Sequence, residues 1–209
     1  MASVRKAVFK HLSVIQISMI QLRNTVQHTF FLWLVLGVIW LVPVARYAMG
    51  DMVYGEFIHA TGEMSARLMM LALAITPLRM LFPKQSWVKW LMLRRRHIGV
   101  AAFAFAVPHL AAYLIRLQPN RIAAEAIEPA MLTGWVAFVV FLLLAVTSND
   151  WSMRWLGRRW KILHRLVYFA AALTFAHWIL TAFDPLSGLL HLLVVAVLEG
   201  YRVWKTRSA

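Results

Sequence analysis

The stretch LGRRWKILHRLVYFAAALTFAHW, residues 156–178, contains the features that decide the fold. It starts with basic residues and continues into an apolar run over 163–182, which is long enough to cross a hydrocarbon core about 30 Å thick. His164 and His177 lie inside this run. An ionisable residue is costly within a bilayer, so the pattern predicts a membrane-spanning helix with functional positions at two depths.

Five more apolar runs of similar length occur along the chain. Of the 209 residues, 62% are hydrophobic and only 14% are charged, which is too little charged surface for a soluble domain of this size. We therefore expect an all-α fold, a polytopic membrane helix bundle of about six transmembrane helices. Their expected ranges are 28–48, 60–81, 97–116, 131–148, 163–182 and 188–204.

The charges between these runs predict the topology. The N-terminus, the C-terminus and two loops, around 84–96 and 154–161, are rich in arginine and lysine, and all four fall on one side if the spans alternate. Five of the eight acidic residues fall on the other side. By the positive-inside rule both termini are cytoplasmic, and the chain is a multi-pass protein in contact with the lipid of a bacterial inner membrane. The net charge of +14 therefore reflects topology, and we expect no binding of nucleic acid.

The first 27 residues differ from the rest. They combine Arg5, Lys6 and Lys10 with polar residues, without the compact apolar core of a cleavable signal. We expect a basic, amphipathic extension over 1–27 and a single transmembrane domain over 28–209. The sequence contains no GxGxxG or Walker-type loop, so a nucleotide-dependent dehydrogenase would be a separate protein.

Histidine is the obvious metal ligand, because the chain has no cysteine. At a rise of 1.5 Å per residue, His164 and His177 lie about 20 Å apart along one span, and His97 and His109 about 18 Å apart along another. His97 then matches His164 in depth, and His109 matches His177. Two helices that offer imidazoles at two levels suit two stacked b-type haems, with His109, His164 and His177 as ligands of haem iron. His59 is a further candidate, and for any single histidine the alternative is an interhelical hydrogen bond.

Helix rotation leaves the pairing open. Spacings of 13 and 12 residues turn two side chains about 140° and 120° apart on an ideal helix. A bend at Pro108 could realign His109. Alternatively, the two haems have ligands from different helix pairs. The second imidazole nitrogen needs a partner, for which Thr174, Thr147, Ser148 and backbone carbonyls are candidates.

Haem propionates require cations. Arg95, Arg96 and Arg165 are candidates at the cytoplasmic level, for propionates or for a quinone, and Arg46 and Arg116 at the periplasmic level. The alternative is that these arginines only orient the bundle. Arg67 lies inside a span, one turn after Glu63, where it forms either an internal ion pair or a cofactor contact.

Several stretches resemble the ferric-reductase-like transmembrane family, and within it the haem-binding membrane subunits of bacterial methionine sulfoxide reductase systems. They are HATGEMSARL at 59–68, ITPLR at 75–79, RRHIG at 95–99, VPHLAAY at 107–113, and the opening stretch at 156–178. The resemblance places His109, His164 and His177 on the haem-ligand positions of the family and His59 on its HxTG histidine. His97 departs from the family pattern.

The resemblance implies an electron-transfer subunit whose partner carries the catalytic centre. Such a subunit takes electrons from the quinone pool, or from a cytoplasmic flavin reductase, and passes them through haem b and a bound FMN. The acceptor is a periplasmic molybdopterin-containing methionine sulfoxide reductase that repairs oxidised proteins. Two alternatives remain: a stand-alone ferric or cupric metalloreductase, and a non-redox transporter or assembly factor.

Overall fold

The computed structural model describes residues 29–208, so the expected N-terminal extension over 1–27, which contains His11, and His28 next to it lie outside the described residues. The chain divides into two units, Met1–Val42 and Pro43–Ala209. The described part of the first unit belongs to an apolar helix, Thr29–Ala48, that is long enough to cross a membrane. The second unit contains the remaining long helices and the candidate site.

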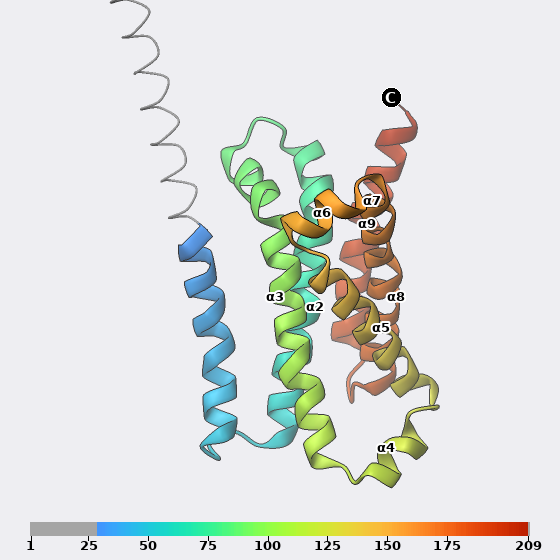
Figure 1. Ribbon diagram of the computed structural model, residues 1–209. Coiled ribbons are helices and arrows are strands. Elements are labelled where there is room, and N and C mark those ends of the chain that lie inside the picture. The colour runs from blue at the N-terminus through green and yellow to red at the C-terminus, as the bar shows by residue number, and fades with distance from the viewer. Residues whose placement is uncertain (1–28, 209) are drawn as a thin grey trace, which may run out of the picture. The chain divides into compact units, whose positions relative to one another are not determined.

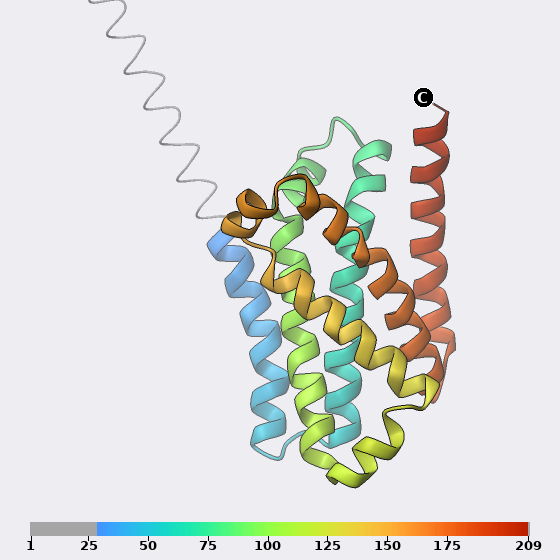
Figure 2. The same cartoon turned by 45° about the vertical axis from the view of Figure 1, so that its right-hand side comes forward.

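The second unit is built from two helix pairs. Helix α2 (Tyr54–Leu81) packs along α3 (Ser86–Arg116), and α5 (Pro129–Val146) packs along α8 (Leu166–Thr181) (Figures 1 and 2). Helix α9 (Leu186–Arg207) lies against α2 and α8. The short helix α4 (Pro119–Glu125) connects the two pairs, and α6 (Asp150–Leu156) and α7 (Arg158–His164) connect α5 to α8 within the second pair.

Six helices within residues 29–208 are long and apolar enough to span a membrane, which confirms the expected number. The boundaries differ most in α3, which begins at Ser86 instead of residue 97. The basic run Arg94–Arg96 continues the helix, because long cationic side chains can follow an apolar surface and place their charges in water. Helix α2 likewise begins at Tyr54 instead of residue 60. The short helices α4 and α6 are not expected from hydropathy.

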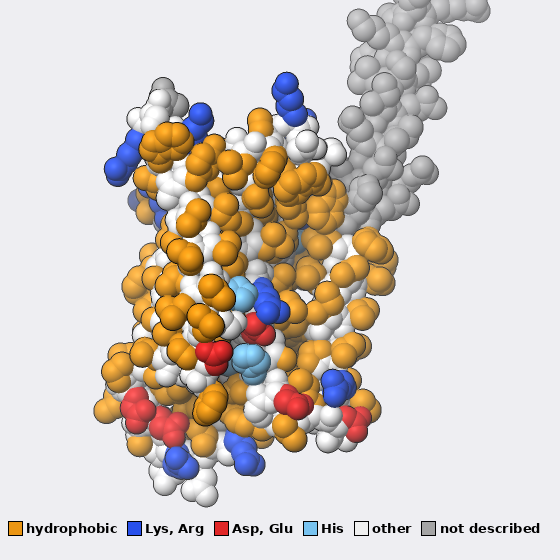
Figure 3. All heavy atoms as spheres, turned by 180° about the vertical axis from the view of Figure 1, so that it is seen from behind, with side chains coloured by type: hydrophobic (Ala, Val, Ile, Leu, Met, Phe, Trp, Pro, Cys, Tyr) orange, Lys and Arg blue, Asp and Glu red, His pale blue; other side chains and the backbone are white. Residues whose placement is uncertain are grey.

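Small side chains bring α2 and α3 close together. Ala66, Ala101 and Ala102 are each at most 2% exposed. The Ser65 hydroxyl donates a hydrogen bond to the Ala102 carbonyl oxygen at 2.8 Å. Such contacts hold membrane helices together, since lipid tails give no hydrophobic drive for helix association. Large apolar side chains are exposed along α5, α8 and α9, and Figure 3 shows hydrophobic side chains over most of the visible surface.

Charged residues gather at the two ends of this unit. Most lysines and arginines lie at the end formed by the α2–α3 connection, α6, α7 and the C-terminus of α9, and most acidic residues lie at the opposite end, with α4 and a few arginines (Figures 1 and 3). This separation is the one that the sequence predicts for a membrane protein with alternating spans.

Candidate functional site

A cavity of about 650 Å³ lies between the two helix pairs and is lined by three histidines: His109 of α3, His177 of α8 and, at its edge, His59 of α2. Its volume falls in the range of small-molecule and cofactor sites. Most of its wall is apolar, with contributions from Phe138 and Trp135 of α5. We refer to it as the histidine-pair cavity.

The two imidazoles have the spacing of ligands that share one metal ion. Their ring centroids lie 6.3 Å apart, and the ring planes are inclined at 87°. Metal–imidazole bonds of about 2.0–2.1 Å on opposite sides of an ion, with each ring centre about 1.1 Å behind its nitrogen, give a little over 6 Å. His109 and His177 are therefore placed to bind a single metal ion from two sides.

Backbone carbonyls orient both rings. His109 Nδ1 lies 2.8 Å from the Ile58 carbonyl oxygen of α2, and His177 Nδ1 lies 2.7 Å from the Ala130 carbonyl oxygen of α5. A carbonyl only accepts, so each Nδ1 carries the proton and donates it. The Nε2 lone pair of each ring is then available to a metal, which is the usual division of roles in a ligating histidine.

Two glycines allow this close approach. A Cβ atom on Gly62 would lie 2.9 Å from Nδ1 and Cε1 of His109, and a Cβ atom on Gly134 would lie 2.8 Å from the same atoms of His177. Contacts this short force a shift of the ring or the helix. Each histidine therefore packs directly against the backbone of the partner helix in its pair.

The supporting residues repeat in the two pairs. In α2 the carbonyl of Ile58 is followed three and four residues later by Thr61 and Gly62, and in α5 Ala130 is followed at the same offsets by Thr133 and Gly134. The hydroxyls of Thr61 and Thr133 donate to these carbonyls as well, at 3.3 and 2.8 Å. The expected backbone carbonyl partners are confirmed for both rings, but the threonine and glycine that accompany each carbonyl were not predicted from the sequence. The recurrence of the dipeptide Thr-Gly, once in each helix, was the available signal.

His59 lies at the edge of the same cavity and not between the paired rings. Its side chain is 63% exposed, and its Nε2 lies 3.6 Å from Oε2 of Glu63. The other carboxylate oxygen of Glu63 pairs with Arg67 Nη2 at 2.6 Å. Arg67 thus forms the internal ion pair that its spacing suggested, and Glu63 connects it to His59.

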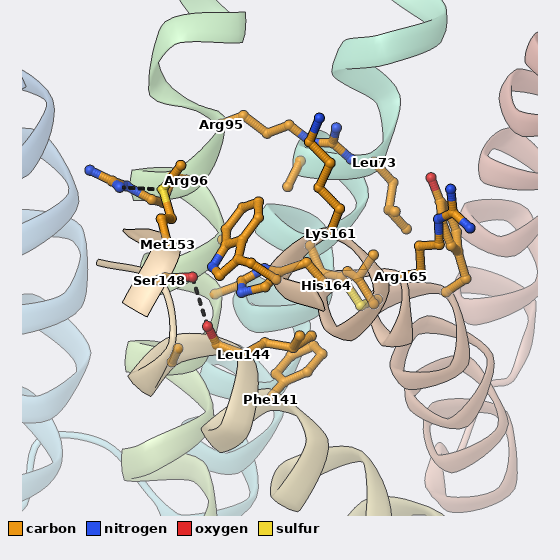
Figure 4. Close-up of a pocket in the computed structure, with 18 of the residues that line it drawn as sticks. Leu73, Arg95, Arg96, Phe141, Leu144, Ser148, Met153, Lys161, His164 and Arg165 are labelled. Atoms are coloured by element: carbon orange, nitrogen blue, oxygen red, sulfur yellow. Dashed lines mark hydrogen bonds between the residues drawn. The ribbon is translucent and has the colours of Figure 1, made fainter. Parts of the chain in front are cut away.

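A second cavity, of about 500 Å³, contains His164 and four basic residues: Arg95, Arg96, Lys161 and Arg165. We refer to it as the basic cavity. His164 Nε2 lies 3.0 Å from the Thr147 hydroxyl, and its ring stacks on Trp160 with centroids 3.9 Å apart. Figure 4 shows Arg95 and Lys161 on one side of His164 and Phe141 on the other. Such a site, with aromatic and cationic walls, suits an anionic planar ligand.

The cations of the basic cavity differ in how they are held. Arg95 Nη1 donates to the Thr76 hydroxyl at 3.1 Å. Arg96 pairs with Asp150, and this hydrogen bond lowers the pKa of the Asp150 carboxyl, which lies outside the spans. The charge of Arg96 is therefore partly neutralised by a carboxylate, whereas Arg95 is hydrogen-bonded to an uncharged hydroxyl.

The matched levels expected for His97 and His164 do not produce a second facing pair. Among the described residues, His164 is the histidine that lines the basic cavity, and His97 lines neither cavity. Residues 164 and 177 also lie on separate helical segments, since the helix is interrupted at Arg165 between α7 and α8. His164 and His177 therefore do not need to lie on the same face of one helix, because each lines a different cavity.

The remaining candidates have local partners. Arg46 Nη2 donates to the Asp51 carbonyl at 3.3 Å, and Arg116 lies over the Tyr54 ring at 5.8 Å. Thr174 and Ser148 donate to carbonyls of their own helices, at 2.8 and 2.7 Å. These four side chains thus contact neither of the paired imidazoles by a hydrogen bond.

Phe141 of α5 lines both cavities. It is 8% exposed and forms part of the wall between them. The two cavities therefore lie one after the other along the bundle, with an aromatic ring at the boundary.

Comparisons with known proteins identify the relatives of this chain. A family model described as "Ferric reductase like transmembrane component" matches residues 61–175. The chain is 39% identical over 158 residues to the "Protein-methionine-sulfoxide reductase heme-binding subunit MsrQ" of Rhizobium meliloti, covering 73% of this chain and 70% of the relative. It is 38% identical over 167 residues to the protein of the same name from Xanthomonas axonopodis pv. citri, covering 78% and 75%. No solved structure matches.

Proposed function

Because this chain belongs to the ferric-reductase-like transmembrane family, among its MsrQ-type membrane subunits, we propose that it carries electrons across a bacterial inner membrane through b-type haem. The observation that carries the proposal is the facing pair of imidazoles, His109 and His177, 6.3 Å apart in a cavity of cofactor size. The names of the relatives, which specify haem, support the same assignment.

The residues of the histidine-pair cavity fit a haem in three respects. Two imidazoles with available Nε2 atoms, His109 and His177, would hold the haem iron between them. The wall is mainly apolar, with aromatic side chains such as Phe138 and Trp135. Each imidazole is held by a carbonyl acceptor, at 2.8 Å for His109 and 2.7 Å for His177. When bound there, haem supplies one-electron transfer between ferric and ferrous iron.

The protein itself sets the conditions for that transfer. A hydrogen bond from Nδ1 to a carbonyl makes an imidazole more electron-rich and stabilises oxidised iron. Ile58 and Ala130 provide these carbonyls, and the glycines of the two helices keep each ring against the backbone. Rigid ligands of this kind require little rearrangement when the charge on the site changes.

We further propose that the basic cavity holds a second redox cofactor. His164 would provide one ligand for a second haem, and Arg95 and Arg165 would neutralise its propionates. The same cations would suit the phosphate of FMN. Phe141, at the boundary of both cavities, then lies between the two cofactors.

The direction of transfer follows from charge. We place the basic end, with the second cavity, at the cytoplasm and the acidic end, with α4, at the periplasm. Electrons enter from the quinone pool, which can reach the protein from within the bilayer, with a cytoplasmic flavin reductase as the alternative donor at the basic end. They leave to a periplasmic molybdopterin-containing methionine sulfoxide reductase, which holds the catalytic centre for the repair of oxidised proteins. The names of the relatives support this partner.

One experiment tests the function at each stage. The protein is purified with its lipids, its haem per polypeptide is measured, and its oxidised and reduced spectra are recorded. We expect a Soret band, a reduced α-band of b-type haem, reduction by a quinol, and reoxidation by the partner with methionine sulfoxide. A purified protein without these bands would favour the transporter or assembly factor. Reoxidation by ferric or cupric ions, but not by the partner, would favour the metalloreductase.

A further inference from the structure

Three ionisable side chains form a stripe along α2 inside a membrane-spanning helix. His59, Glu63 and Arg67 are spaced four residues apart, and the side chains of His59 and Arg67 are 63% and 50% exposed. Arg67 lies about 20 Å from the start of α2 at Tyr54, close to the middle of the helix. Figure 3 shows histidine, basic and acidic side chains gathered within a hydrophobic surface.

This position is costly for charged groups. Glu63 and Arg67 lower the cost by pairing at 2.6 Å, but ionisable residues at such a depth usually mark a functional site. An ion pair that served only to stabilise α2 would not need to line a cavity of cofactor size. Both His59 and Glu63 line the histidine-pair cavity. The stripe therefore connects an exposed face of α2 with the space beside His109.

The chemistry of the stripe restricts the ligand. The ligand must be soluble in the bilayer, because the three side chains lie within a membrane span. A lipid headgroup does not meet this condition, since headgroups lie at the membrane surface. The ligand must also form hydrogen bonds with an imidazole and a carboxylate, and both groups can accept protons. A hydroquinone meets these conditions. We infer that His59, Glu63 and Arg67 form the site where a hydroquinone binds and releases its protons, an inference that rests on the proposed function.

The balanced step is the oxidation of the hydroquinone to a quinone. Both O–H bonds break, one proton passing to Nε2 of His59 and one to the carboxylate of Glu63. The two electrons would leave one at a time, and a haem held by His109 and His177 would be the one-electron oxidant for each, passing the first electron on to the acceptor before it takes the second. Arg67 holds one oxygen of Glu63 at 2.6 Å, which leaves the other oxygen, 3.6 Å from His59, to accept the proton.

The test uses the full-length, haem-loaded protein in nanodiscs. The rate of haem reduction is measured with decylubiquinol and with menadiol, for the wild type and for Glu63→Gln and His59→Gln. Glu199→Gln is the matched control, because Glu199 of α9 also pairs with an arginine inside a span, Arg202 at 3.0 Å, but lines neither cavity. Dithionite reduction and haem content are recorded for each.

We expect Glu63→Gln and His59→Gln to slow reduction by quinol at least tenfold, with unchanged haem content and dithionite reduction, and Glu199→Gln to match the wild type. If Glu63→Gln loses haem, His59→Gln decides, because the His59 side chain is mostly exposed. Wild-type rates in variants with full haem would overturn the site while leaving the proposed function intact. A haem-loaded wild type that neither quinol reduces would overturn the quinone donor, and the site with it.

Discussion

His109 and His177, from two different helix pairs, face each other with ring centroids 6.3 Å apart and planes inclined at 87°. Each ring is fixed by a carbonyl on the partner helix of its own pair. The two pairs, α2 with α3 and α5 with α8, therefore each contribute one ligand and one support. A metal bound by both rings would join the two halves of the bundle.

Replacing either ligand should remove this link. We expect His109→Ala and His177→Ala each to abolish the haem of the histidine-pair cavity, since one imidazole leaves the iron without its second strong ligand. Haem per polypeptide and the low-spin spectrum measure the loss. His191→Ala is the control, because His191 donates to the Ser187 carbonyl of its own helix at 2.7 Å and lines neither cavity. Full haem content in both ligand variants would contradict the assignment.

The glycines beside the rings should be nearly as sensitive. Gly62→Ala and Gly134→Ala place a Cβ atom 2.9 and 2.8 Å from ring atoms, and overpacking of this kind costs on the order of 1–3 kcal/mol. We expect haem dissociation to become about tenfold to a hundredfold easier, measured by transfer of haem to an apo-globin. Gly200→Ala, where nothing lies within 4 Å of the added atom, should behave as the wild type. An equal effect at all three positions would remove the steric explanation.

The sequence predicts the spans more completely than the site. Long apolar runs predict the six helices, and the basic clusters predict which helix ends lie on the same side of the membrane. The start of α3 at Ser86 is missed, since a helix can continue through Arg94–Arg96 after the apolar run has ended. The partnership of His109 with His177 depends on how α3 and α8 are tilted and rotated, which contacts between distant segments decide. Spacing alone favoured a second pair of facing histidines, His97 with His164. In the structure His164 lines the basic cavity, whereas His97 lines neither cavity.

The shared carbonyl of Ala130 predicts an effect on redox potential. This oxygen accepts from His177 Nδ1 at 2.7 Å and from the Thr133 hydroxyl at 2.8 Å. In Thr133→Val the imidazole becomes the main donor, its bond strengthens, and oxidised iron is favoured. We expect the midpoint potential of the haem to fall by on the order of tens of millivolts, measured by optical titration.

The equivalent threonine provides a graded comparison. Thr61 lies farther from its shared carbonyl, 3.3 Å from the oxygen of Ile58. Thr61→Val should therefore lower the potential less than Thr133→Val, at equal haem content. A larger shift for Thr61→Val, or a rise in potential for Thr133→Val, would contradict this view of the two carbonyls.

The ion pair of Arg96 with Asp150 predicts a dependence on pH. Arg96 lowers the pKa of Asp150 below its ordinary value, so the pair stabilises the folded protein above that value and is lost as the pH falls through the lowered pKa. We expect Asp150→Asn to lower the midpoint of thermal unfolding slightly at neutral pH, and the difference from the wild type to vanish in acid. High salt should reduce it as well, because Asp150 is exposed.

A variant of His164 distinguishes the two cofactors proposed for the basic cavity. His164 is the histidine that lines this cavity among residues 29–208, and four basic side chains surround it. If a second haem binds there, His164→Ala should reduce haem per polypeptide by about half and leave the spectrum of the histidine pair unchanged. If FMN binds there, haem content should stay constant, and Arg95→Gln should release flavin. His97→Ala should retain all haem, because His97 lines neither cavity. A loss of half the haem in His97→Ala would instead restore the symmetric arrangement of four ligands at two levels.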